Sequence, residues 1–354
     1  MKMLYRKNDK GYTLVELLIA IVIGFVLISA ATATYIAQNR SYIAQESVSE
    51  INTQSKIAHD LIANAIKGAG YGVPADMGQD TINGFTTIII PVEGGVDISS
   101  PADAITIVGG FRRVGELWPA GGGTIACPGG VVPMDANTIR IVYTGNAALD
   151  TVDRRFISID GIDFLEVSSC TLDGNGDCDA NNDISLDRPL LQDFPLLDTG
   201  GSTACDVGRP VYLIEDVTFC VDANSTLRRI RRNADITNCA GIAGSDNDVI
   251  AENIEDLQFA YAVDANNDGQ IDDLNSNNML DGGDFINGSA VINDADIRAI
   301  RINILARAAR PDVNYAGLGL VNPLTIENRT HAATSDDFRR RWWQTLITMR
   351  NQGD

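Results

Sequence analysis

The chain has 354 residues, which is enough for one large domain or two smaller ones with real hydrophobic cores. Lys and Arg number 27 against 47 Asp and Glu, so the formal net charge is −20. This charge repels phosphate backbones on average and argues against nucleic acid as the main partner. A basic cluster is the exception, and a strand facing solvent explains it more simply than DNA contact does; its members are Arg228, Arg229, Arg231 and Arg232.

The amino terminus combines a basic segment with a long apolar one. Residues 1–10 carry four basic side chains against one acidic one, and the apolar run extends from Tyr12 to about Ala37, interrupted by Glu16. The segment from Leu17 to Ala37 carries no charge. Its length matches the roughly 20 residues that one helical membrane crossing requires. The basic flank should stay in the cytoplasm, with the rest of the chain on the other side of the membrane. A plain signal anchor is the alternative interpretation.

The motif around this one acidic residue is specific. Residues 11–20 read GYTLVELLIA, and a carboxylate inside an apolar helix is costly without a function. The motif resembles the leader junction of type IV prepilins and pseudopilins, where prepilin peptidase cuts after the glycine and methylates the new amino terminus. The resemblance implies a leader of residues 1–11 and cleavage between Gly11 and Tyr12. It also implies that Glu16 serves filament assembly by pairing with a neighbouring subunit's amino terminus, a partner that makes its burial tolerable.

Beyond the membrane segment, the pattern predicts that the helix continues. Small and apolar residues recur at spacings of three and four, as on one face of an amphipathic helix: Val48, Ile51, Ser55, Ala58, Ile62 and Ala65. We therefore predict a pilin helix over residues 12–70, transmembrane at 12–37 and amphipathic at 38–70. Glycines from Gly68 to Gly72, followed by Pro74, should end it.

The remainder, residues 71–354, should form a β-rich extracytoplasmic globular head. Short β-branched runs bounded by Gly, Asn and Asp predict strands at 86–92, 104–108, 138–143, 211–221, 256–263, 297–306 and 343–349. Because no regular helices separate these runs, we predict an α+β fold. In it, the long N-terminal helix packs on a mainly antiparallel β-sheet with long loops.

Four scattered segments extend the resemblance: KGAGYG at 67–72, EDLQFAYAVD at 255–264, DIRAIRINILAR at 296–307 and TMRN at 348–351. They are similar to segments of PilW-type minor pilins. This implies a minor pilin of the type IV pilus that is inserted in the inner membrane and then joins the pilus at the cell surface, in the complex that initiates the fibre or forms its tip. Its expected partners are prepilin peptidase, other minor pilins, the major pilin and a tip adhesin. Twitching motility, cell adhesion, DNA uptake and electron transfer are the fibre functions of this class, and the sequence does not choose among them.

The leading alternative is a minor pseudopilin of a type II secretion system. The chain is long for most pseudopilins, and large pseudopilins of the tip class tend to lack the glutamate that Glu16 supplies. Both observations favour the pilus.

An acidic loop at residues 264–272, DANNDGQID, follows the calcium spacing of EF-hands. Gly269 permits the sharp bend, and the loop supplies side-chain oxygens from Asp264, Asn266, Asp268 and Asp272 and a carbonyl from Gln270. Position twelve departs from the pattern, because Asn275 replaces the usual glutamate. Asp273, Asp281 and Asp284 are candidates to complete the shell. A loop of Asx turns without metal is the alternative.

A second acidic stretch repeats the DANND string at residues 179–183. Its candidate calcium ligands are Asp179, Asn181, Asp183 and Asp187. Ile184 stands where glycine is needed, so a surface loop closed by a Cys170–Cys178 disulfide explains this stretch better than calcium does.

The six cysteines all follow the apolar segment: Cys127, Cys170, Cys178, Cys205, Cys220 and Cys239. An even number in the exported part predicts disulfides formed in an oxidising compartment, with the pairing left open. Zinc is a weaker interpretation, because the chain has no C-x-x-C and only two histidines.

We predict no catalytic residues. His331 is the only histidine of the predicted head, and the sequence contains no G-x-S-x-G elbow and no phosphate-binding glycine loop. A carbohydrate-active domain carried on a pilin helix is the remote enzyme-class alternative, because many acidic residues form pairs by chance.

Overall fold

The computed structural model describes most of the chain. The described residues are 12–73, 82, 85–95, 100–127, 129–144, 149, 154–179, 183–199, 204–231, 239, 246–266, 268–277, 279–288, 296–312, 315, 319–320 and 322–349. Residues 1–11 lie outside the described residues, and so do Asn181 and Arg232.

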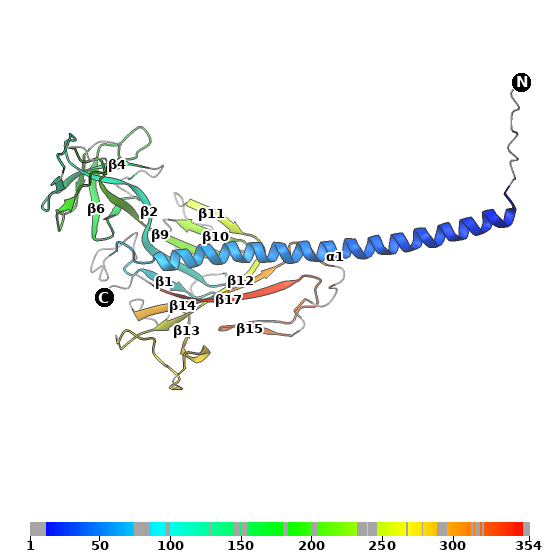
Figure 1. Ribbon diagram of the computed structural model, residues 1–354. Coiled ribbons are helices and arrows are strands. Elements are labelled where there is room, and N and C mark those ends of the chain that lie inside the picture. The colour runs from blue at the N-terminus through cyan, green and yellow to red at the C-terminus, as the bar shows by residue number, and fades with distance from the viewer. Residues whose placement is uncertain are drawn as a thin grey trace, which may run out of the picture.

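One long helix, α1 (Leu14–Gly68), organises the molecule. Its first half projects away from the head, and its second half lies along the head (Figure 1). Thr13 caps its start, and Gly70 and Gly72 follow its end with φ values of 71° and 74°, a left-handed region that glycine adopts without strain. At Gly72 a Cβ would also lie 2.5 Å from the Oγ of Ser158, so a larger residue would not fit there.

The second half of α1 buries a stripe at spacings of four and three: Ser47, Ile51, Ser55, Ala58, Ile62 and Ile66. The predicted stripe was wrong at Val48, whereas Ala65 at its other end is partly buried and packs against the core. Val48 is 39% exposed and Ala65 is half-buried, while their neighbours Ser47 and Ile66 face the head. At about 100° per residue, a stripe shifted by one position at each end still runs along one face of the helix, so spacing alone did not fix its limits.

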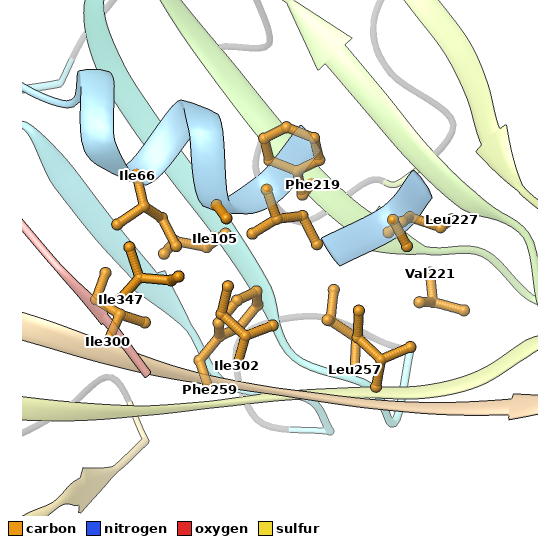
Figure 2. Close-up of a cluster of buried hydrophobic side chains, with 14 of the residues drawn as sticks. Ile66, Ile105, Phe219, Val221, Leu227, Leu257, Phe259, Ile300, Ile302 and Ile347 are labelled. Atoms are coloured by element: carbon orange, nitrogen blue, oxygen red, sulfur yellow. The ribbon is translucent and has the colours of Figure 1, made fainter. Parts of the chain in front are cut away.

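An antiparallel sheet of order β13-β12-β14-β17 lies against this stripe, four-stranded within the described residues. Its strands are β12 (Ile254–Val263), β13 (Ile286–Asn287), β14 (Ile297–Arg307) and β17 (Arg340–Thr348). Figure 2 shows the core between helix and sheet, where Ile66 from α1 approaches Ile347 from β17 and Phe259 from β12 packs beside Ile302 from β14.

A larger sheet, nine-stranded among the described residues, has the order β1-β2-β4-β7-β6-β5-β9-β10-β11, with β2 also paired to β9. Its strands are β1 (Ile89–Val92), β2 (Ala104–Pro119), β4 (Thr138–Tyr143), β5 (Phe156–Ile159), β6 (Asp163–Cys170), β7 (Asp183–Leu186), β9 (Arg209–Val221), β10 (Leu227–Arg231) and β11 (Asp246–Ala251). Shorter pairs join β3 (Val131–Val132) to β8 (Phe194–Pro195) and β15 (Leu324–Ile326) to β16 (Arg329–His331).

The long strands β2 and β9 connect two lobes. Near α1 they contribute Ile105 and Phe219 to the core below the helix. Farther along, the pairing returns from β2 through β4, β7, β6 and β5 to β9, which closes a ring around a second core containing Leu117 and Leu165. We call this closed part the distal lobe; it lies beyond the C-terminal end of α1 (Figure 1). The prediction of an α+β fold with a mainly antiparallel sheet is confirmed.

Candidate assembly helix and acidic loops

The first half of α1 has the physical character of a membrane-spanning or filament-packing segment. Among the described residues, α1 is a helix long and apolar enough to cross a membrane. Its large apolar side chains, such as Leu17 and Phe25, are exposed along the segment that the head does not cover. Because exposed apolar surface of this extent is unfavourable in water, this half needs lipid or other helices around it.

Glu16 sits in the first turn of this exposed helix. Its Oε2 accepts hydrogen bonds from the backbone amide of Thr13 at 2.9 Å and the Thr13 hydroxyl at 3.0 Å, and its own amide donates to Thr13 Oγ1 at 3.2 Å. This is a capping box, which satisfies amides that have no intrahelical partner. Tyr12, which precedes Thr13, is 90% exposed, while Gly11 lies outside the described residues. The carboxylate therefore has a local partner while remaining exposed.

The six cysteines form three disulfides, Cys127–Cys205, Cys170–Cys178 and Cys220–Cys239. The prediction of disulfides is confirmed, and the short loop at Cys170–Cys178 is the pairing expected from its acidic sequence. The long-range bridge Cys127–Cys205 staples two loops of the distal lobe, where regular strands are short.

The candidate calcium loop leaves β12 at Asp264, a fully buried carboxylate. Asp264 accepts hydrogen bonds from the amides of Asp268 at 3.0 Å and Gly269 at 3.1 Å, and from Arg298 Nε at 3.2 Å. Asp272 turns back to accept from the amide of Ala265 at 2.8 Å. The loop is thus folded around its acidic side chains, which accept hydrogen bonds from the protein's own amides and from Arg298.

The other residues of this loop follow the same pattern. Asn266 donates through Nδ2 to Asp272 at 3.0 Å, and the amide of Gln270 donates to Asp268 at 2.8 Å. No group of three or more His, Cys, Asp or Glu side chains in the described part of the chain is arranged to hold a metal ion. Any cation here would therefore rely on amide and backbone oxygens as well as carboxylates.

Asp281 and Asp284, named as candidates to complete this shell, belong to a segment of their own. Asp281 accepts from Asn275 Nδ2 at 2.8 Å and Asn277 Nδ2 at 2.6 Å, and buried Asp284 accepts from the amide of Asp281 at 2.7 Å. From Asp273 onward, these residues stand at positions one, three, five, nine and twelve of the same calcium spacing. This second register of the calcium spacing was not predicted, although the spacing is visible in the sequence.

The described acidic side chains around β7 do not come together at one site. Asp183 accepts from Arg140 and from the amide of Gly121 at 2.9 Å, while Asp187 accepts from the amide of Glu166 at 2.8 Å. The two carboxylates are thus each engaged with a different element of the distal lobe.

The basic cluster on β10 is neutralised by acidic partners. Arg229 and Arg231 both bond Asp248 on the neighbouring strand β11, and Arg228 bonds Asp222 at 2.7 Å. The described arginines therefore form a cross-strand ion-pair network rather than a stripe available to phosphates.

His331 is also in a structural pairing. Its Nε2 lies 2.6 Å from Oδ2 of Asp256, which is buried and also pairs with Arg329. These contacts hold the β15–β16 hairpin against β12. No nucleophilic side chain is among the bonded partners of His331 in the described part of the chain.

Comparison with known families places this architecture. Residues 6–32 match the prokaryotic N-terminal methylation motif, and residues 211–351 match the model of type IV pilus-assembly protein W. The chain therefore carries the amino-terminal motif of type IV prepilins and a C-terminal region similar to PilW. Comparisons with curated proteins and with solved structures found no match.

The two matches divide this prepilin in a way that the fold explains. The methylation motif covers Gly11, Tyr12 and Glu16 at the start of α1, and the PilW match runs from β9 through β17. It therefore contains the whole sheet on which the second half of α1 packs. Strands β3 to β8, most of the distal lobe, lie outside both matches. The prepilin is a minor pilin of the type IV pilus.

Proposed function

We propose that this minor pilin acts structurally, in the complex that initiates the type IV pilus or forms its tip. The observation that carries this proposal is the shape of the head. The distal lobe extends past the end of α1 that lies opposite the exposed half (Figure 1). A subunit with such a lobe at its far end suits the end of a fibre better than the repeating shaft, where neighbours stack above every subunit.

In this proposal, the precursor is inserted in the inner membrane with residues 1–11 in the cytoplasm and the disulfide-bearing head outside. Prepilin peptidase cleaves between Gly11 and Tyr12 and methylates the new amino terminus. Glu16 then exchanges its bonds to Thr13 for a neighbouring subunit's amino terminus as the α1 helices pack. Packing, and not turnover of a substrate, is the mechanism.

The partners that follow are prepilin peptidase, other minor pilins and the major pilin, with a tip adhesin as a further candidate for the exposed head. Deletion of the chain in cells that make pili tests the proposal. We expect surface pili to be lost while secretion of a type II substrate persists. Intact pili with failed secretion would identify a pseudopilin instead.

We further propose that the loop at residues 264–272 binds calcium. Its support is the oxygen spacing at Asp264, Asn266, Asp268 and Asp272 together with the turn that Gly269 makes at a φ of 82°. Calcium would replace Arg298 as the partner of Asp264 and rigidify the connection between β12 and β13.

A further inference from the structure

Strand β17 is an open edge of the sheet that carries α1. It pairs with β14 alone, from Ala299 opposite Thr348 to Arg307 opposite Arg340. The amide of Met349 donates to the carbonyl of Arg298, and the amide of Ala308 donates to the carbonyl of Arg339. These two bonds show that the odd-numbered residues of this strand are the ones hydrogen-bonded to β14. Because bonding alternates along an antiparallel strand, the backbone groups of the even-numbered residues from 340 to 348 point away from the sheet. Within the described residues, no strand meets them.

This edge lacks the devices by which proteins prevent edge pairing. From Trp342 to Thr348 the strand contains no charge, proline or glycine. Trp342 and Leu346 are 43% and 42% exposed, and as even-numbered residues they lie on the face opposite buried Ile347. The strand thus offers both backbone hydrogen-bonding groups and apolar side chains.

Other edges of the described sheets are protected. Strand β1 is short and contains Pro91, and β11 carries Asp248. Strand β13 has two residues. The contrast singles out β17 as a surface for strand addition, in which an extended segment of another chain extends the sheet.

We infer that β17 accepts an extended strand from another subunit of the same fibre, a step that rests on the proposed function. Arg341 lies at one end of the edge and bonds the amide oxygen of Asn52, whereas its neighbour Arg340 is paired with Glu255 and Asp336. The incoming strand should therefore place a carboxylate opposite Arg341 and apolar residues at alternate positions over Trp342 and Leu346.

A second copy of this chain does not fit as an antiparallel partner. Strand β17 runs in the same direction as α1, because Arg341 bonds Asn52 and Ile347 packs near Ile66 (Figure 2). Antiparallel pairing of two β17 edges would point the two α1 helices in opposite directions. Two helices anchored from one side of a membrane cannot adopt that arrangement. We therefore infer a strand of a different pilus subunit as the partner, rather than antiparallel pairing with β17 of a second copy.

A matched pair of substitutions at Gln344 tests this inference in the full chain, in cells that make pili. Gln344 is even-numbered, so its amide points outward, and proline on an open edge removes that donor without breaking the ladder to β14. Gln344→Pro and Gln344→Ala both lose the side-chain bond to Asn303, but alanine retains the amide. We expect Gln344→Pro to reduce co-purification of the other pilus subunits several-fold and Gln344→Ala to leave it unchanged. Equal effects of the two variants, or no effect of proline, would overturn the inference.

Photo-crosslinking provides a second readout that does not depend on how the proline variant folds. A photoreactive residue replaces Gln344, and in a parallel strain it replaces Leu191, which is 68% exposed on the distal lobe. We expect an adduct at position 344 whose crosslinked peptide belongs to another pilin, and no such adduct at position 191. Absence of an adduct at 344, or an adduct to a second copy, would overturn the inference. Normal pili after deletion of the whole chain would instead overturn the proposed function.

Discussion

The carboxylate of Glu16 accepts hydrogen bonds from the amide and the hydroxyl of Thr13 at 2.9 and 3.0 Å, and the amide of Glu16 donates back to Thr13 Oγ1 at 3.2 Å. Two roles are therefore combined in Glu16, helix capping and the proposed pairing between subunits. Substitution of each partner separates them. We predict that Glu16→Ala strongly reduces incorporation of the chain into sheared pili, because no carboxylate remains to pair with a neighbour's amino terminus.

Thr13→Val is the matched control, since it removes the cap and keeps the carboxylate. Loss of a cap costs about 1 kcal/mol, which a long membrane-embedded helix tolerates. We expect this variant to enter pili at nearly the wild-type level, measured by immunoblot against the major pilin. Equal losses in both variants would show that Glu16 serves only the helix.

The core between α1 and the four-stranded sheet should dominate the stability of the part of the head near the helix. Phe259 is fully buried there, so Phe259→Ala should lower the free energy of unfolding by about 3–5 kcal/mol through lost transfer energy and a cavity. Urea denaturation of the detergent-solubilised chain measures this. Leu191→Ala at an exposed site is the control and should change it by less than about 0.5 kcal/mol. A small effect at Phe259 would contradict the observed packing.

The disulfides should differ in their contribution according to the loop that each closes. Cys127–Cys205 spans 78 residues and Cys170–Cys178 spans 8. Chain-entropy arguments give about 4.5 kcal/mol for the first and about 2.5 kcal/mol for the second. Paired substitutions to serine, compared by urea denaturation, should therefore rank Cys127–Cys205 as the more stabilising bridge. The opposite order would show that the distal lobe is already ordered without it.

Asp103 should make the stability of the head depend on pH. Burial raises its pKa to about 7, opposed by hydrogen bonds from the amides of Gly94 and Phe259, and the nearby charge of Asp256 raises it further. The unfolded chain releases this proton near pH 3.8, so between roughly pH 4 and 7 the folded chain binds more protons than the unfolded chain. The contribution of Asp103 to the free energy of unfolding is therefore present below that window and is lost as the pH rises through 7.

The variant Asp103→Asn cannot titrate and isolates this effect. We expect the difference in thermal midpoint between wild type and variant to move in favour of the variant as the pH rises from 4 to 8. A difference that stays constant across this range would contradict the raised pKa.

Calcium binding to the loop at 264–272 should raise the thermal midpoint of the full chain, because an ion that binds only the folded state stabilises it. Asp268→Ala should abolish this increase by removing the ligand at position five. Asp187→Asn removes a carboxylate of the other DANND region and should leave it unchanged. If calcium does not raise the thermal midpoint, or if magnesium raises that of the Asp268→Ala variant equally, the loop is a set of Asx turns without metal.

Much of this architecture was predictable because its signals are local. The apolar run with Glu16 and the glycines from Gly68 onward predict α1, and β-branched runs predict the strands that became β9, β12 and β14. The α+β arrangement follows from the order of those elements. The two lobes were not predictable, because they depend on β2 extending past Gly109 and Gly110, where glycine interrupts the strand pattern.

The missed details depend on contacts between distant residues. Burial of Ser47 in place of Val48 is decided by where the sheet meets the helix, and the free edge at β17 is decided by the order of strands in that sheet. The pairing of Arg229 with Asp248 likewise needs the register between β10 and β11. Sequence spacing along one segment carries none of this information.

Mass spectrometry of this chain recovered from sheared pili tests directly whether it is processed and assembled as a pilin. We expect an amino-terminal peptide that begins at Tyr12 and carries one methyl group. Substitution of Gly11 by a bulky residue should leave the chain at precursor size and absent from the pili. A chain in the pili that still begins at Met1, or normal processing of the Gly11 variant, would contradict this expectation.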